Sequence, residues 1–263
     1  MAAGSTEEDD AGAHATTVAG AVTGPGYSGR VLTGPDRSGA ARVGAFFDVD
    51  NTIIRGASTF HLAVGLYRRG LLRASDIAMF AVRQARYRAF GENRRQMDEA
   101  RAAALALVRG HSVAEMGLIA EDVYDEVMAL RIYPGARRLL DAHRAAGHRV
   151  WLVTAGPREV GEIIARRLGA AGALGTIVEQ EDGRYTGRLC GDLLHGSAKA
   201  DAVAVLAEQE GIDLRSSYAY GDSTHDVPIL SLVGNPVAIN PDRRLRRHAE
   251  RVGWPVREFS TRG

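Results

Sequence analysis

The stretch AFFDVDNTII, residues 45–54, places two carboxylates between an apolar run and a second apolar pair. Asp48 and Asp50 carry like charges one residue apart, and no Lys or Arg lies beside them. The apolar residues ahead of them predict a strand over residues 43–49, buried in a sheet. Two repelling charges at the end of a buried strand indicate a site that holds a cation there.

The composition describes a globular chain with no charge bias. At 263 residues it is long enough for a sizeable core, in one large domain or one domain with an insert. Lys plus Arg total 33 and Asp plus Glu total 32, so net charge favours neither a nucleic-acid partner nor a membrane surface. Cys190 is the single cysteine, which fits a cytoplasmic protein. The acidic first residues and the lack of a long apolar run predict neither a signal peptide nor a membrane span.

The chain divides into three parts by composition and periodicity. Residues 1–41 are rich in Gly, Ala, Ser, Thr and Pro and are predicted to be a disordered tail. Residues 58–130 show helical periodicity without an intervening strand, which predicts a small helical bundle. Its four candidate helices begin near Ser58-Thr59, at Ser75, near Arg95 and at Ser112, where Glu115 completes a capping-box pattern.

After Tyr133-Pro134-Gly135, strands and helices alternate, which predicts a parallel sheet covered by helices on both faces. The fold class is therefore α/β, with a core over residues 42–56 and 133–263 and a helical cap over 57–132, inserted after the first strand. The expected elements are helix 136–146, strand 149–153, helix 157–168, a hairpin of 175–181 with 184–190, helix 197–210, strand 217–220, helix 227–232 and strand 236–239.

Polar residues cluster where ligands bind in such sheets, beyond the carboxyl ends of the strands. The set comprises Asp48, Asp50, Thr154, Ala155, Gly156, Lys199 at a helix start, Asp222, His225 and Asp226. Several carboxylates brought together need a cation, and hard oxygen ligands suit Mg²⁺, which commonly binds carboxylates together with a substrate phosphate.

The same set suits phosphate chemistry. Lys199 supplies a positive charge for a phosphate oxygen, and the helix start at Gly156-Pro157 offers backbone N–H groups to an anion. An Asp can attack phosphorus and form an aspartyl-phosphate, while a second carboxylic acid protonates the leaving oxygen and then activates water.

These residues resemble the four motifs of the haloacid dehalogenase (HAD) superfamily, in their usual order and over about residues 43–259. The motifs are DVDNT at 48–52, the strand ending in Thr154, Lys199, and GDSTHD at 221–226. The inserted helices resemble the C1 cap of the phosphoserine-phosphatase-like subgroup, and the chain is most similar to the HAD-IB hydrolases. The resemblance implies a Rossmann-like core. It also implies that Asp48 is the nucleophile and a Mg²⁺ ligand, and that Asp50 is the general acid/base and gives its backbone carbonyl to the metal. Thr154 and Lys199 would hold the phosphoryl group, and Asp222 and Asp226 would lie at the metal. Ala155 and His225 fall on the phosphate and substrate side of the site.

The chain departs from phosphoserine phosphatases at three places in the sequence. Ala57 stands where they usually carry a Glu that binds the amino group of serine, Thr154-Ala155-Gly156 replaces Ser-Gly-Gly, and His225 replaces Asn. The expected activity is therefore a Mg²⁺-dependent phosphatase for a small phosphorylated metabolite. Phosphoserine, histidinol phosphate and other amino-alcohol or sugar phosphates all remain candidates. A phosphotransferase and a non-catalytic binding module are the alternatives, and the intact motifs oppose the second.

The remaining histidines and the cysteine are predicted to be structural. No two histidines lie at metal-ligand spacing, so positions such as His61 and His143 are expected on the surface or in the cap. Cys190 is expected to pack within the hairpin. The sequence predicts no oligomeric state.

Overall fold

The computed structural model describes residues 41–75, 78, 82, 102, 105, 106 and 108–260. The tail predicted over residues 1–41 lies, apart from residue 41, outside these residues, as do most of the two helices predicted to begin at Ser75 and near Arg95. Within the described part of the chain, no helix is both long enough and apolar enough to cross a bilayer.

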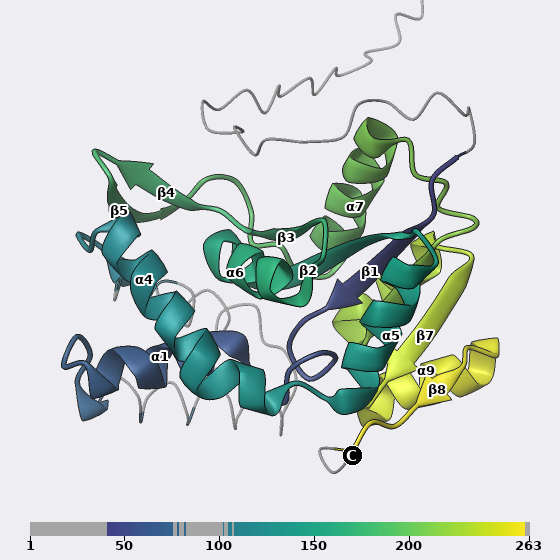
Figure 1. The fold of residues 1–263 in the computed structure, drawn as a ribbon, viewed down its shortest axis with the longest axis horizontal. Helices are drawn as coiled ribbons and strands as arrows, with labels where there is room; N and C mark the ends of the chain where they lie inside the picture. The colour runs from purple at the N-terminus through teal and green to yellow at the C-terminus, as the bar shows by residue number, and fades with distance from the viewer. Residues whose placement is uncertain are drawn as a thin grey trace, which may run out of the picture. The chain divides into compact units, whose positions relative to one another are not determined.

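A six-stranded parallel sheet forms the centre of the fold (Figure 1). Its first strand in the sequence lies in the interior of the sheet, between strands that follow the helical insert, because a strand with apolar residues on both faces is most stable there. The prediction of an α/β fold with a parallel sheet is confirmed. In spatial order the strands are β3 (Gly172–Thr176), β2 (Arg149–Pro157), β1 (Gly44–Asp48), β6 (Tyr218–Gly221), β7 (Asn235–Ile239) and β8 (Val256–Arg257).

Helices cover both faces of this sheet, and successive residues of β1 show why. Phe46 packs with the apolar residues of α7 (Ser197–Glu210), α8 (Val227–Leu232) and α9 (Arg243–Val252). Phe47 points the other way and packs with α5 (Pro134–Ala145) and α6 (Arg158–Leu168). Side chains of a strand alternate between its faces, so one short apolar stretch anchors both layers of helices.

The helical insert lies between β1 and α5 in the sequence (Figure 1). Its described helices are α1 (Ser58–Arg68) and α4 (Val113–Val123), and α4 continues through a π turn at Tyr124–Met128 and a 3₁₀ turn at Ala129–Arg131. The predicted cap of α4 is confirmed, because the Ser112 hydroxyl accepts a hydrogen bond from the Glu115 amide.

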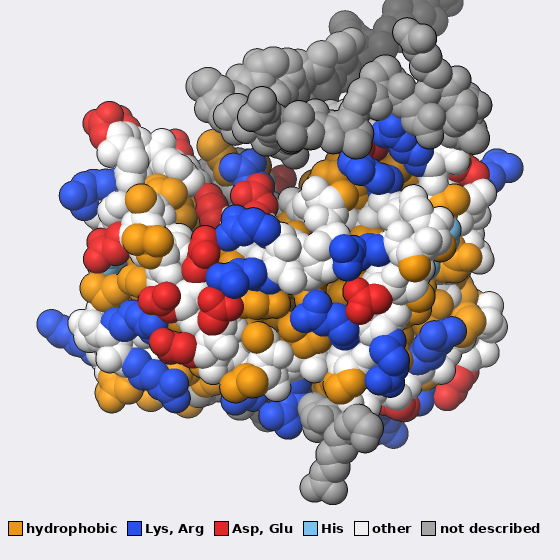
Figure 2. Space-filling view, in the orientation of Figure 1, with side chains coloured by type: hydrophobic (Ala, Val, Ile, Leu, Met, Phe, Trp, Pro, Cys, Tyr) orange, Lys and Arg blue, Asp and Glu red, His pale blue; other side chains and the backbone are white. Residues whose placement is uncertain are grey.

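Ion pairs and backbone hydrogen bonds attach α4 to elements outside the insert. Glu121 of α4 pairs with Arg166 and Arg167 of α6 at 2.7 and 3.4 Å, and Figure 2 shows acidic and basic side chains side by side on this face. Just ahead of α4, backbone hydrogen bonds join residues 110–113 to the hairpin of β4 (Val178–Glu181) and β5 (Arg184–Leu189).

Several boundaries predicted from sequence are wrong, and β2 runs to Pro157 although its end was predicted at residue 153. The hairpin does turn at Asp182-Gly183, but Gly175 and Thr176 belong to β3, which pairs in parallel with β2. β3 reads GALGT, so its sequence lacks the bulky β-branched residues that would distinguish it as a strand. Pro157 is the N-cap of α6 and not its first helical residue.

The C-terminal elements α9 and β8 were not predicted. α9 is rich in Arg and buries only Leu245 and Ala249, so its apolar stripe is too narrow to be recognised from the sequence. Its start is fixed by Asp242, whose carboxylate accepts hydrogen bonds from the amides of Arg244 and Leu245.

Two structural expectations for single residues are also wrong. His143 is buried between α5 and the sheet and hydrogen-bonds the Tyr220 hydroxyl, whereas a surface or cap position was predicted. Cys190 is exposed immediately after β5 and does not pack within the hairpin. In both cases the side chain's environment depends on elements distant in the sequence.

Candidate active site

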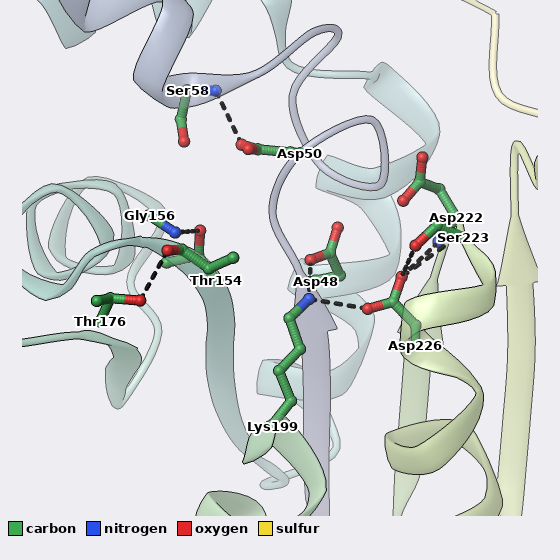
Figure 3. Close-up of polar contacts among 11 residues, drawn as sticks. Asp48, Asp50, Ser58, Thr154, Gly156, Thr176, Lys199, Asp222, Ser223 and Asp226 are labelled. Atoms are coloured by element: carbon green, nitrogen blue, oxygen red, sulfur yellow. Dashed lines mark hydrogen bonds and ion pairs between the residues drawn. The ribbon is translucent and has the colours of Figure 1, made fainter. Parts of the chain in front are cut away.

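Asp48 and Asp50 are separated by a tight turn at the end of β1. The backbone amides of Ile53 and Ile54 both donate to the carbonyl oxygen of Val49, and Asn51 adopts a left-handed conformation with φ 62°. The turn directs the two carboxylates to different positions, so that they border one site without contacting each other (Figure 3). This geometry explains how the chain tolerates two like charges one residue apart.

Lys199, in the first turn of α7, is the buried cation of the site. Its Nζ donates to Asp48 Oδ1 at 2.5 Å and to Asp226 Oδ1 at 2.8 Å (Figure 3). Burial lowers the pKa of this ammonium, but Asp226 and Asp48 more than offset that effect, and the net pKa is raised. Lys199 therefore stays charged throughout the neutral range and holds one oxygen of Asp48 in place.

Asp226 organises the loop that follows β6. Its Oδ2 accepts hydrogen bonds from the amides of Asp222 and Ser223 and from the Ser223 hydroxyl, each at 3.2 Å. Gly221 permits this arrangement, because a Cβ at that position would lie 2.5 Å from Cβ of Asp226. Both oxygens of Asp226 are thus engaged, and the loop presents the Asp222 carboxylate toward Asp48.

Three carboxylates gather here around a single ammonium. Oxygens of Asp48, Asp222 and Asp226 lie within 4.8 Å of one another, and Asp48 Oδ2 is buried without a hydrogen-bond partner. Burial is the main cause that raises the pKa of Asp48 to about 7, opposed by Lys199 and assisted by Asp226 and Asp50. Burial, followed by Asp48 and Asp226, also raises the pKa of Asp222 well above its ordinary range. An orphaned carboxylate oxygen among hard oxygen donors fits a divalent cation such as Mg²⁺.

Thr154 lies across the site from Asp222, near the end of β2. Its Oγ1 accepts a hydrogen bond from the Gly156 amide at 3.0 Å, which leaves the hydroxyl proton available to a ligand. The neighbouring Ala155 carbonyl accepts a hydrogen bond from Thr176 Oγ1 at 2.7 Å. That hydroxyl also accepts from the Leu194 amide at 3.1 Å, so β3 and the segment before α7 support the irregular last residues of β2, 154–156, which we call the Thr154 loop.

His225 lies on the same loop as Asp222, in the 3₁₀ turn Thr224–Asp226. Its ring packs edge-on against His195, with ring centroids 4.3 Å apart. His225 therefore shares its turn with Asp226 and packs on a residue of the segment that leads into α7.

The sequence profile of the haloacid dehalogenase-like hydrolases matches residues 45–231, which include all of these side chains. The chain belongs to this HAD family. Together with its similarity to bacterial phosphatases, this match makes it a phosphoric monoester hydrolase. The fold predicted from the resemblance is confirmed.

Individual HAD proteins are similar over most of the chain. A phosphoserine phosphatase of Mycobacterium tuberculosis is 49% identical over 216 residues, which cover 82% of this chain and 70% of that protein. A histidinol-phosphatase of Neisseria meningitidis is 30% identical over 219 residues, covering 82% and 98%. A crystal structure of a protein of unknown function from Bordetella pertussis superposes with a TM-score of 0.73 at 31% identity, covering 82% of this chain and 98% of that one.

Sequence reasoning missed two residues of this HAD site. Ser58 was interpreted as a helix cap, but the cap position is Ala57 and the Ser58 amide donates to Asp50 Oδ1 at 2.9 Å. Thr176 was assigned to a hairpin, although it supports the Thr154 loop. The roles of both residues depend on contacts with other segments of the chain. The one indication in the sequence was that Ser58 lies close to the first motif.

Proposed function

We propose that this HAD protein is a Mg²⁺-dependent phosphomonoesterase that works through an aspartyl-phosphate on Asp48. One observation carries the proposal: Oδ1 of Asp48 is fixed by Lys199 and its Oδ2 is buried and unpartnered, in a carboxylate that lies close to those of Asp222 and Asp226. A carboxylate held by one oxygen, with the other free at the end of a buried strand, is suited to attack on phosphorus.

The first step transfers the phosphoryl group to the enzyme. One carboxylate oxygen of Asp48 forms a bond to phosphorus as the bond between phosphorus and the substrate's alcohol oxygen breaks, and Asp50 gives its proton to that alcohol oxygen. In this proposal Lys199 and the Thr154 hydroxyl stabilise the phosphoryl oxygens, and Ala155 lies beside them on the phosphate side of the site. In the second step water attacks the aspartyl-phosphate, its proton returns to Asp50, and phosphate leaves.

The proposed metal ligands are Asp48, Asp222 and the backbone carbonyl of Asp50, with Asp226 in support. Bound Mg²⁺ would neutralise charge on the phosphoryl group and offset the repulsion among the carboxylates. Because both oxygens of Asp226 accept hydrogen bonds, its main contribution is to hold Asp222 and Lys199 in register.

We infer a small phosphorylated metabolite as substrate. Similarity to a phosphoserine phosphatase and to a histidinol-phosphatase supports the phosphate ester of an amino alcohol. Ala57 and His225 differ from the serine-recognition pattern, so phosphoserine is one candidate among several. The segment 57–132, predicted to be a helical cap, is proposed to close over the site, with hinges near Arg55-Gly56 and Tyr133–Gly135.

A cytoplasmic location is also proposed, because the exposed thiol of Cys190 fits a reducing compartment.

Release of phosphate from a panel of alkyl phosphomonoesters, measured with Mg²⁺ and with EDTA, tests the proposal. Wild type is expected to turn over at least one ester only with the metal, and Asp48→Asn is expected to abolish turnover. Asp141→Asn removes a carboxylate from the exposed surface of α5 and serves as the matched control. Turnover that persists in EDTA or in Asp48→Asn would contradict the mechanism.

A further inference from the structure

Helix α1 begins without a side-chain cap of its own. Its N-cap residue is Ala57, in an extended conformation, and Ser58 is the first helical residue. The amide of a first helical residue has no partner within the helix, and Ser58 is only 2% exposed, so water does not replace that partner. The missing partner is Asp50, whose Oδ1 accepts from the Ser58 amide at 2.9 Å (Figure 3).

The loop between these residues keeps them in this register. Asn51, in its left-handed conformation, accepts a hydrogen bond from the Gly56 amide at 3.1 Å through Oδ1 and donates its own amide to the carbonyl of Ile54 at 2.7 Å. These bonds close the loop tightly, so the position of Asp50 is coupled to the start of α1.

The first turn of α1 also lies against the loop that carries Thr154. A Cβ added to Gly156 would lie 3.3 Å from Cγ2 of Thr59 and 3.6 Å from Oγ of Ser58. The Asp50 carboxylate thus sits at the side of the site formed by α1 and the Thr154 loop, across from Lys199 (Figure 3).

We propose that Ser58 is a positioning residue whose backbone N–H orients Asp50 for proton transfer, and so couples that transfer to the first helix of the insert. The proposal rests on the proposed phosphatase function. The N–H donates to Oδ1, so in this proposal Oδ1 is held as an acceptor and the proton is transferred from Oδ2. Once the proton has passed to the departing alcohol, the same N–H stabilises the carboxylate that remains.

Ser58→Pro removes this N–H at a position where proline fits. Proline is favoured as the first residue of a helix, and Ala57 already has the extended conformation that precedes proline. Ser58→Ala is the matched variant, because it removes the hydroxyl, which also interacts with the Asp50 carboxylate, and keeps the N–H, so that the two variants together isolate the backbone contribution.

The measurement is the rate of phosphorylation of Asp48 in a single turnover, by rapid quench, with an alkyl phosphate and with p-nitrophenyl phosphate. An alkoxide must be protonated as it leaves, whereas p-nitrophenolate leaves without a proton. In Ser58→Pro the rate of Asp48 phosphorylation by the alkyl phosphate is expected to fall by about 10²-fold or more, which is the usual contribution of general acid catalysis. The rate of p-nitrophenol release is expected to equal that of wild type. In Ser58→Ala the fall is expected to be at least about ten times smaller, since only one hydroxyl contact is lost.

Equal losses with both esters would show a general structural defect and overturn the proposal, as would no loss with either. Absence of turnover in wild type would instead refute the phosphatase function itself, and the proposal with it. If Ser58→Pro does not fold, Asn51→Gly carries the test. Glycine keeps the positive φ of Asn51 but removes the acceptor of the Gly56 amide. The same selective loss on the alkyl phosphate is expected there, and its absence would overturn the proposal.

Discussion

The buried His143 predicts how the stability of the protein depends on pH. Its side chain is 6% exposed, its Nε2 hydrogen-bonds the Tyr220 hydroxyl at 2.7 Å, and its Nδ1 lies 2.8 Å from Nδ1 of His148. The ring also packs against Tyr218, with centroids 4.7 Å apart. Burial and, after it, the neighbouring His148 lower the pKa of His143 from 6.5 to about 4.

The sign follows from which state takes up the proton first. On acidification the unfolded chain protonates this imidazole near pH 6.5, while the folded protein resists protonation until about pH 4. The stabilisation is therefore complete above pH 6.5 and is lost as the pH falls toward 4. From these two values His143 alone lowers the free energy of unfolding by about 2 kcal/mol between pH 7.5 and pH 5, and by about 3 kcal/mol at pH 4.

Urea denaturation of wild type and His143→Gln at pH 7.5 and pH 5, in EDTA at constant ionic strength, measures this contribution. Between the two pH values the free energy of unfolding is expected to fall by about 2 kcal/mol less in the variant than in wild type. Tyr220→Phe is the matched control, because it removes the hydroxyl partner but keeps the imidazole buried, so the pH effect of His143 should persist. Equal losses of stability in wild type and His143→Gln would refute the reasoning.

Three further predictions concern the site and the packing of the insert. Lys199→Met leaves Asp48 and its neighbours without their cation. Urea denaturation in EDTA at pH 8 should show a free energy of unfolding lower by about 3–5 kcal/mol, and a loss below about 1 kcal/mol would contradict the pairing. Gly65→Ala places a methyl group against Val123 of α4 and should lower the free energy of unfolding by about 1–3 kcal/mol in the same assay. Adding Val123→Ala should restore part of this stability, and a double variant no more stable than Gly65→Ala would rule out the contact. Gly221→Ala should displace Asp226 and weaken Mg²⁺ binding, measured by calorimetry, by about 10–100-fold, whereas wild-type affinity would show that the loop tolerates the added carbon.

Much of the fold was predictable because it depends on local patterns. The apolar residues of β1, the alternation of strands and helices after residue 133 and the Ser112 cap are all visible in the sequence, and the structure confirms them. β3 and α9 escaped prediction, since one is rich in glycine and the other buries a narrow apolar stripe. For such elements, pairing and packing with the rest of the fold outweigh local propensity.

The sequence by itself predicted the charged groups that gather at the site, although not Ser58 or Thr176. Asp48, Lys199 and Asp222 each lie at the end of a strand or the start of a helix, Thr154 lies in the last residues of β2, and a parallel sheet brings such positions to one edge. The order of the motifs was enough to predict the HAD family, which the comparison with its profile confirms.

Only the tertiary structure decided what each group does with its neighbours. It engages both oxygens of Asp226, leaves Oδ2 of Asp48 without a partner, buries His143 and joins Asp50 to the amide of Ser58. The physical reason is that hydrogen bonding and desolvation depend on distances of a few ångströms between segments far apart in the chain. The spacing of residues in a sequence fixes such distances within one helix or strand, but not between them.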